Sequence, residues 1–377
     1  MRSVAVCHES LRQTMPENRS LQTVAFDGVA VTCGLINVPP PVFDAVAPEN
    51  CYKVLVRITA FSCNYRDKMF ILLAHDKCRQ RSNSYYAVGS EFVGVVVAVG
   101  AAVTHFKVGD RVMGNNSYDG PGIDAQGVAE GTASHQASKE FQVFHQRKLI
   151  LVPADMPDEI AAAFTVGAQT AAGMVRRANL RPGENVLVTS AKANTSLFII
   201  NALKKQDVHV VAASSSLAFA DELQRMGVKS VVQVEPDLPS FGQNAQFMAL
   251  LRRQGPFHCI FDPFFDLHLG KVLDVMAVNG RYITCGFGDQ YHDWTNPRGQ
   301  RQLNQHDIMK VVFLKNLHIM GNCLGSTDDL ENALVDYSQG RLSVAIDSLF
   351  CGDDVAPFFE RTYNARERFG KVVYRYT

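Results

Sequence analysis

Two patterns of hydrophobic and polar positions divide this chain. In the first 155 residues, short apolar–polar alternations recur, as in YKVLVRITAFS (52–62) and EFVGVVVAVG (91–100), and Gly or Asp-Gly separates them. Alternation predicts strands, because successive side chains of a strand point to opposite faces. We therefore expect residues 1–155 to form a compact, mostly antiparallel β domain.

The period changes near residue 156. The Ala-rich segment MPDEIAAAFTVGAQTAAGMVRRANL predicts one long helix, which ends at the turn RPGEN. Apolar and helical runs then alternate, which indicates βαβ units in a parallel sheet, as in a doubly wound α/β domain. The pattern places strands near 185–190, 208–214, 229–234, 258–262 and 281–286, and helices near 195–206, 217–227, 240–254 and 267–279.

The last segment differs again. STDDLENALVDYSQGRLSVAIDSLF, followed by RFGKVVYRYT, predicts an amphipathic helix and two more strands. We expect these strands to return to the first domain. The domain assignment is therefore 1–155, completed by 326–377, for the first domain and 156–325 for the second.

Composition restricts the partners. The chain has 37 Lys and Arg against 37 Asp and Glu, so no net field favours nucleic acid or an anionic membrane surface. No apolar run is long enough to span a bilayer, and the first residues lack the apolar core of a signal peptide. Nine cysteines are scattered without a CxxC pair, which fits free thiols in a reducing cytosol. We expect a cytoplasmic protein that acts on a small molecule or a peptide.

Four segments carry a resemblance to a known superfamily. They are AFSCNYRDKMF (60–70), VGSEFVGVVVAVGAAVTHFKVGDRVMG (88–114), FDPFFDLHLGKVLDVMAVNGRYITCGFG (261–288) and RERFGKVVY (366–374). Their order and spacing resemble the medium-chain dehydrogenase/reductase superfamily over nearly the whole chain. The resemblance implies a chaperonin-10-like β catalytic domain, a Rossmann domain and an active site in the cleft between them. Within the superfamily, the chain is most similar to the zinc-free quinone oxidoreductase and enoyl reductase branch.

The positions that bind catalytic zinc in the alcohol dehydrogenases differ here. The resemblance places Asn64 where a ligand Cys stands, three residues before Asp67, and Ser90 where a ligand His precedes Glu91. A zinc site needs thiolate and imidazole ligands, whereas Asn and Ser offer only neutral oxygens. The helical segment AAFTVGAQTA, which matches the region of the third ligand, has no cysteine. We expect no zinc, and we interpret Cys63 as a small buried hydrophobe.

The turn after the first Rossmann strand contains no glycine. Family members place glycines there so that the backbone can approach a pyrophosphate, and small residues hold the matching positions here. The dipole and free N–H groups of the helix N-terminus remain, and a Ser or Thr can cap the helix or donate to a phosphate. A lysine in the turn either faces a phosphate or is solvated. The expected cofactor residues of this turn are Ser190, Lys192, Ala193, Asn194, Thr195 and Ser196.

The end of the second Rossmann strand distinguishes NADPH from NADH. An NAD site places a carboxylate there for the ribose hydroxyls, but AASSSLAFAD has no acid before Asp221. The hydroxyls of Ser214, Ser215 and Ser216 can accept a 2′-phosphate, or they form a serine-rich helix cap. We therefore expect NADPH as the cofactor.

Reduction of an activated C=C bond fits a site that has no Lewis acid. It needs hydride delivery and hydrogen-bond donors for the enolate oxygen. We expect Asn64 to point its amide into the cleft and Tyr65 to donate to the enolate, with packing as the alternative role of Tyr65. The resemblance places Cys285 and Gly286 near the nicotinamide. We expect an NADPH-dependent, zinc-independent reductase of an enone, enoyl or dehydroamino acid substrate, with natural-product tailoring as one setting.

Two other functions fit parts of the sequence. A non-catalytic binding or regulatory protein that kept the fold would explain the missing glycines. A zinc alcohol dehydrogenase would require displaced ligands. The resemblance also implies a homodimer joined through the edge of the Rossmann sheet, at NLHIMGNCLG (316–325).

Overall fold

The computed structural model describes residues 1–14, 21–119, 123–291 and 305–377. These residues form two compact units: Met1–Val166 with Val344–Thr377, and Gly167–Ser343. The first unit gives way to the second after Val166, and the second ends at Ser343. The sequence placed these two boundaries earlier, after residues 155 and 325. The domain assignment stays a prediction. Across the described part of the chain, every helix is too short or too polar to cross a membrane.

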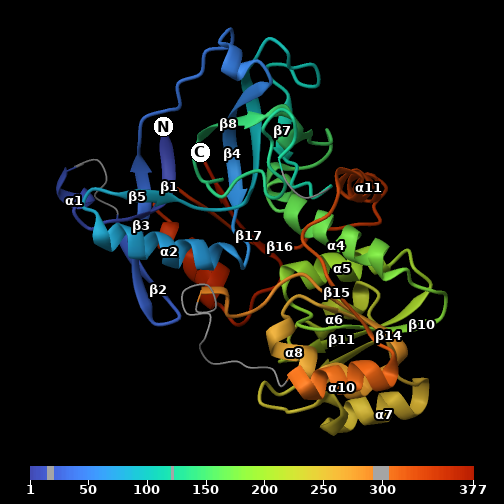
Figure 1. The fold of residues 1–377 in the computed structure, drawn as a ribbon. Helices are drawn as coiled ribbons and strands as arrows, with labels where there is room; N and C mark the ends of the chain where they lie inside the picture. Colours follow the sequence, from blue (N-terminus) through green and yellow to red (C-terminus); the bar gives the residue numbers. More distant parts are fainter. Residues whose placement is uncertain (15–20, 120–122, 292–304) are drawn as a thin grey trace. The chain divides into compact units, whose positions relative to one another are not determined.

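Two mostly antiparallel sheets build the first unit (Figure 1). In β4 (Lys53–Ser62), every second residue from 54 to 60 is buried, which is the period of two expected from the sequence. β4 pairs with β6 (Glu91–Val99), and Ser62 lies opposite Glu91. The larger sheet also contains β7 (Arg111–Gly114), β8 (Phe141–His145), β9 (Leu149–Leu151), β16 (Ile346–Cys351) and β17 (Lys371–Arg375), and the smaller contains β1 (Arg2–Cys7), β2 (Gln22–Phe26), β3 (Val29–Asn37) and β5 (Tyr85–Ala87).

A helix that the sequence pattern did not predict follows β4. α2 (Asp67–Gln80) has an acid in its first turn and bases in its last, which suits the helix dipole. It packs against β1, β3 and β5 and thereby fixes the far end of the loop 63–66. The other helices of this unit are short: α1 (Leu11–Thr14), α3 (Asp158–Ala161), α12 (Val355–Phe359) and a π-helix (Glu360–Asn364).

The C-terminal strands join the first unit, as the sequence predicts. β17 pairs antiparallel with β4, with Val373 opposite Ser62, and β16 pairs in parallel with β17. The return brings the segment around Lys371 beside the end of β4 and the start of β6. Residues from three distant parts of the chain therefore meet at one end of this sheet.

The second unit is a parallel sheet in the doubly wound order. Its strands lie in the order β12-β11-β10-β13-β14-β15, and every pairing is parallel. This is the strand order of a Rossmann domain, with the switch point between β10 and β13. The strands are β10 (Glu184–Val188), β11 (Val208–Ser214), β12 (Ser230–Gln233), β13 (Phe257–Asp262), β14 (Met276–Thr284) and β15 (His318–Gly321); the helices are α5 (Asn194–Leu203), α6 (Ala220–Arg225), α7 (Ala245–Gln254), α8 (Phe265–Val272), α10 (Gln305–Lys315) and α11 (Thr327–Ser338).

Two element predictions were wrong. The long helix expected after residue 156 is broken into α3 and α4 (Thr165–Ala178). The helix expected over 267–279 ends at Val272, and β14 already begins at Met276. Residues 162–164 form a turn between α3 and α4. Before β14 the apolar run fits either a helix or a strand, and tertiary contact decides, since Met276 pairs with Phe257 of β13.

Candidate functional site

The turn after β10 keeps a glycine-like backbone although it contains no glycine. Ser190 has φ +45°, in the left-handed region that glycine favours. The turn is closed by hydrogen bonds from Ala191 N to Ala213 O, at 2.9 Å, and from Ala193 N to Ser190 O, at 2.8 Å. The small side chains therefore accept the conformation that the family builds with glycine.

The turn leads directly into the N-terminus of α5. Ala193 is the N-cap residue, and its side chain makes no capping hydrogen bond. The first helical hydrogen bond runs from Leu197 N to Ala193 O, so the N–H groups before it have no acceptor within the helix. Asn194 Oδ1 is buried and has no hydrogen-bond partner among the described residues. This helix end thus offers donors for an anion and one buried acceptor for a ligand hydroxyl.

Lys192 connects the turn to the end of the next strand. Its Nζ donates a 2.8 Å hydrogen bond to Ser216 Oγ. Ser214 is the last residue of β11 and is buried, and its Oγ accepts from Ser216 N at 3.4 Å. Ser215 is exposed, and its carbonyl accepts from Gln233 Nε2 at 3.3 Å. The structure therefore brings Lys192 of the turn to Ser216, which follows Ser214 and Ser215 at the end of β11.

Ser196 does not cap the helix. Its buried hydroxyl donates to Thr189 O at 2.9 Å, which ties α5 to the end of β10. Thr195 lies in the first turn of α5, and its side chain makes no hydrogen bond to another described residue. Of the two hydroxyls expected to serve a phosphate, that of Ser196 is committed to the backbone.

A buried carboxylate that the sequence did not single out for function lies at the carboxyl end of β13. Asp262 accepts from Thr189 Oγ1 at 2.7 Å and from Tyr282 OH, and His268 Nδ1 lies 2.9 Å away. Burial alone would raise the pKa of Asp262, but the hydrogen bonds from these groups and the charge of His268 outweigh it and lower the pKa. The cluster holds the ends of β10, β13 and β14 together.

Cys285 and Gly286 follow β14 directly. Burial raises the pKa of the Cys285 thiol to about 12, so it stays protonated. A Cβ on Gly286 would lie 2.9 Å from Pro263 O. The carbonyl oxygen of Gly286 accepts a hydrogen bond from Phe265 N at 3.0 Å. Close packing against the segment after β13 is therefore one reason for glycine at this position.

In the first unit, the side chains of Asn64 and Ser90, which match zinc ligands, are hydrogen-bonded to each other. Asn64 Nδ2 donates to Ser90 Oγ at 3.0 Å and to Glu91 Oε2 at 2.8 Å. Ser90 Oγ in turn donates to Asp67 Oδ2 at 2.6 Å. Both amide hydrogens of Asn64 are thus used inside the protein, which differs from the expectation that the amide points to a substrate.

A lysine contacts one of the two positions that match zinc ligands. Lys371 Nζ donates to Asn64 Oδ1 at 2.8 Å and forms an ion pair with Glu91. Cys63 is buried, and burial raises its pKa well above the ordinary value, so it is not a thiolate. Neutral oxygens and an ammonium group are unsuitable donors for zinc. The residues at this position therefore do not fit a catalytic zinc ion.

Tyr65 is exposed at the start of the helix α2. Tyr65 is 42% exposed, and the Lys68 ammonium lies 5.0 Å from the centre of the Tyr65 ring. A phenol in this position can donate to an oxygen of a ligand. Of the two predicted catalytic residues, Tyr65 is exposed, whereas Asn64 is held in the network.

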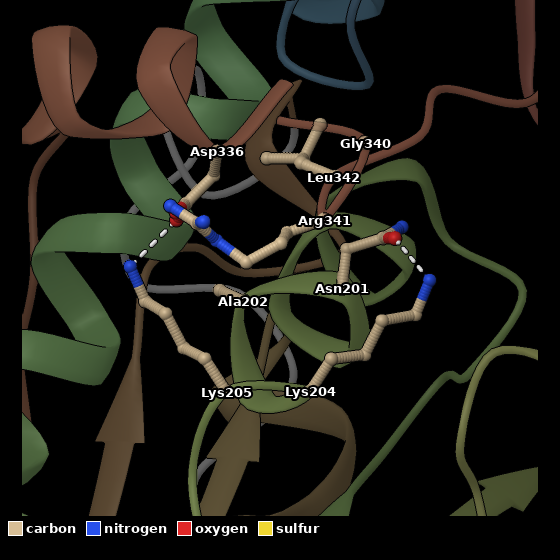
Figure 2. Close-up of a pocket in the computed structure, with 8 residues that line it drawn as sticks. All are labelled: Asn201, Ala202, Lys204, Lys205, Asp336, Gly340, Arg341 and Leu342. Carbon is tan, nitrogen blue, oxygen red and sulfur yellow. Dashed lines mark hydrogen bonds and ion pairs between the residues drawn. The ribbon is translucent and has the colours of Figure 1, made fainter. Parts of the chain in front are cut away.

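A separate pocket of about 240 Å³ lies at the other end of α5 (Figure 2). Lys205 and Arg341 both pair with Asp336, at 2.5 and 2.7 Å, and Lys204 Nζ donates to Asn201 Oδ1 at 2.8 Å. The ten residues of α5 separate this pocket from the cofactor turn by about 15 Å. These three basic side chains are therefore already paired with neighbouring side chains. Positive charge near the C-terminal end of a helix is also stabilised by the helix dipole.

Comparison with known proteins identifies the superfamily. The family model described as "Alcohol dehydrogenase GroES-like domain" matches residues 50–154. Quinone oxidoreductase-like protein 2 of Bos taurus is 28% identical over 347 residues, which cover 89% of this chain and 88% of the relative. The chain belongs to the medium-chain dehydrogenase/reductase superfamily. Acryloyl-coenzyme A reductase of Metallosphaera sedula is 24% identical, with 85% of this chain and 91% of the relative covered.

Other matches are partial or show the fold alone. Quinone oxidoreductase-like protein 2 homolog of Nematostella vectensis is 33% identical over 165 residues, but these cover only 43% of this chain and 40% of that relative. An NAD-dependent alcohol dehydrogenase has a TM-score of 0.73 at 20% identity, with 100% and 99% of the chains covered. A 2-octenoyl-CoA carboxylase reductase, solved with NADP and 2-octenoyl-CoA, has a TM-score of 0.73 at 18% identity, with 99% and 87% covered. The medium-chain dehydrogenase/reductase fold therefore extends over both units.

Proposed function

We propose that this member of the medium-chain dehydrogenase/reductase superfamily is an NADPH-dependent, zinc-independent reductase of an activated C=C bond. The substrate is an enone, an enoyl thioester or a dehydroamino acid, in a small molecule or a peptide. The observation that carries the proposal is the hydrogen bond between Asn64 and Ser90, with the Lys371 ammonium beside it, at the positions that match zinc ligands. Such a site cannot polarise an alcohol or ketone through zinc.

The names of two similar proteins support the choice of a C=C bond. One relative is an acryloyl-coenzyme A reductase, and one structural neighbour was solved with NADP and 2-octenoyl-CoA. Both substrates contain a C=C bond conjugated to a thioester carbonyl. Hydride addition to such a bond needs a positioned cofactor and a donor for the carbonyl oxygen, and no metal.

The cofactor turn supports NADPH over NADH. Lys192 and Ser216 supply an ammonium and a hydroxyl 2.8 Å apart, and no acid stands between Ser214 and Asp221. A 2′-phosphate would accept from both groups, whereas a ribose hydroxyl would lack its usual carboxylate. The α5 N-terminus would hold the pyrophosphate, and Ser190 gives the backbone the required turn. When bound, NADPH supplies the hydride.

The residues of the first unit supply the remaining parts of the reaction. Tyr65 donates a hydrogen bond to the carbonyl oxygen of the substrate, which stabilises the enolate that hydride addition forms. Asn64 keeps the backbone just before Tyr65 in place, since its side chain is hydrogen-bonded to Ser90, Glu91 and Lys371. Water or a side chain then protonates the α carbon.

The edge of the parallel sheet supports a homodimer. β15 is the last strand of this sheet in the described part of the chain, and His318 and Ile319 are exposed. An exposed strand edge presents backbone groups that a second copy can pair with. This edge coincides with the segment 316–325 that the resemblance assigns to dimerisation.

A spectrophotometric assay of NADPH consumption tests the proposed function. The panel contains enones, acryloyl and enoyl thioesters, and dehydroalanine peptides, each beside its saturated analogue. We expect consumption with at least one alkene, one product per NADPH, and none with the saturated analogues. Tyr65→Phe should lower kcat about tenfold or more, because it removes a donor to the enolate.

Two companion measurements address the alternatives: titration of the protein with NADPH, and an assay of NADP⁺ reduction by alcohols with and without added zinc. NADPH bound without turnover of any alkene would favour the non-catalytic binding protein. Oxidation of alcohols that depends on added zinc would favour a zinc alcohol dehydrogenase. Both outcomes contradict the proposal.

A further inference from the structure

The buried ion pair between Lys371 and Glu91 is the starting observation. Lys371 is 2% exposed and Glu91 is fully buried. Removing two charges from water costs several kcal/mol per ion, and the mutual attraction repays this only when further hydrogen bonds satisfy both groups. A pair of this kind therefore needs a surrounding network.

The carboxylate of Glu91 has such a network. Its Oε1 accepts from Val166 N at 2.7 Å, at the N-terminus of α4, where the helix dipole favours negative charge. Its Oε2 accepts from Asn64 Nδ2 at 2.8 Å and from Lys371. Glu91 thus joins a helix end, the Asn64 loop and the C-terminal strand.

Lys371 is placed by the backbone before it. Gly370 has φ +107°, and a Cβ there would lie 2.3 Å from Ala345 O. Lys371 is the first residue of β17, which is paired on one side with β16 and on the other with β4. The ammonium group is therefore delivered from a fixed strand end and not from a flexible loop.

The ammonium determines which way the Asn64 amide faces. A lysine can only donate hydrogen bonds, so the group 2.8 Å from Nζ must be the carbonyl oxygen of the amide. The Nδ2 side then faces Ser90 and Glu91, which accept. The same segment contributes a second contact, because Tyr363 OH donates to Asn64 O at 3.2 Å.

We propose that Lys371 supplies, from within the chain, the positive charge around which the loop 63–67 is organised, in contact with Asn64, which matches a zinc ligand of zinc-dependent relatives. It is a positioning residue: it fixes Asn64, and through Asn64 it fixes the backbone that carries Tyr65. The proposal that Lys371 positions the loop does not require the reductase activity. Only the expected effect of Lys371 on kcat rests on the proposed function.

The competing explanation is that Lys371 only fills space. Lys371→Met keeps the volume and removes the charge, and Lys371→Ala leaves a channel that n-propylammonium matches atom for atom beyond Cβ. Tetramethylammonium has the same charge but is too wide, so it serves as the control salt. Lys107→Met is the matched control variant, because Lys107 forms an exposed ion pair with Asp110.

The experiment measures thermal unfolding of the full chain in these salts. We expect Lys371→Met and Lys371→Ala to lower Tm by roughly 10 °C, since breaking a buried pair leaves an uncompensated charge. n-Propylammonium should restore part of the loss in Lys371→Ala alone, and tetramethylammonium should restore none. Equal Tm values for Lys371→Met and the unchanged chain, or equal recovery with both salts, would overturn the proposal.

A double variant keeps the test decisive if the single variants do not fold. Glu91→Gln with Lys371→Met removes both charges, and it should fold and exceed Lys371→Met in Tm, because no lone charge is left buried. An active alkene substrate adds a second readout. Lys371→Met should then lower kcat about tenfold, because a misplaced donor loses transition-state contact, while the Kd for NADPH changes less than about twofold. Failure of the unchanged protein to reduce any alkene contradicts only the proposed function, because the unfolding experiment does not use the reaction.

Discussion

The Lys192 ammonium and the Ser216 hydroxyl lie 2.8 Å apart and are hydrogen-bonded. The bond joins the glycine-free turn after β10 to the end of β11, which are the two places where a Rossmann domain contacts the phosphates and the adenosine ribose. A cation and a hydroxyl therefore stand where NAD-dependent enzymes place a carboxylate. The proposed preference for NADPH over NADH depends on this pair.

Lys192→Met should weaken NADPH binding and leave NADH binding nearly unchanged. A hydrogen bond to a charged phosphate is worth roughly 1.5–3 kcal/mol, so we expect the Kd for NADPH to rise about tenfold or more. The Kd for NADH should change less than about twofold. Lys204→Met is the matched control, because Lys204 lies at the opposite end of α5. Equal weakening of both cofactors would contradict a contact with the 2′-phosphate.

Ser190→Gly and Ser190→Val should have opposite effects on stability. Ser190 has φ +45°, which costs an L-residue roughly 1–2 kcal/mol, and glycine avoids this cost but loses more chain entropy. We expect the free energy of unfolding of Ser190→Gly to be unchanged or raised by up to about 1 kcal/mol. Ser190→Val should lose about 2 kcal/mol, because a β-branched residue is strained there. Denaturant unfolding measures both, and a stable Val variant would argue against the left-handed turn.

Asp262→Asn should destabilise the protein in a pH-dependent manner. The pKa of Asp262 is lowered in the folded state, so its carboxylate stabilises above the unfolded pKa, and this is lost as the pH falls through the folded pKa. We expect the variant to lose roughly 2 kcal/mol at pH 7, and the difference to shrink below about pH 4. Unfolding curves recorded from pH 7 to below about pH 4 measure the difference. A gap that widens on acidification would show that the sign is wrong.

Ile319→Lys should convert the proposed dimer to a monomer. Ile319 is 40% exposed on the terminal strand β15, and a buried lysine at the dimer contact would be left without a partner. Val278→Lys is the control, since Val278 is 60% exposed on β14. Light scattering after gel filtration gives the mass of each variant. A dimer that survives Ile319→Lys would place the interface elsewhere.

Local patterns in the sequence predicted most of the second unit. The strands β10, β11, β12 and β13 lie within a few residues of their predicted positions, because each is a short apolar run bounded by turn residues. The start of β14 was missed, since the run before it has no turn signal until Asn279. α2 was missed as well, because its polar residues conceal the buried side.

The network around Asn64 was beyond local patterns. Lys371 and Asn64 are 307 residues apart in sequence, and only the return of β17 to β4 brings them together. The resemblance singled out Asn64 and Ser90, but it gave no reason to connect them with Lys371. The one available signal was the Gly370-Lys371 pair inside the segment RERFGKVVY. The left-handed backbone of Ser190 could not be predicted either, because a serine in the sequence does not indicate a positive φ.

Calorimetric titration of the purified chain with NADPH, repeated with NADH, tests the central claim most directly. We predict one NADPH bound per chain, with an affinity at least about tenfold higher than that for NADH, which corresponds to the roughly 1.4 kcal/mol or more that the Lys192 and Ser216 contacts contribute. No detectable heat at millimolar NADPH, or a preference for NADH, would contradict the assignment.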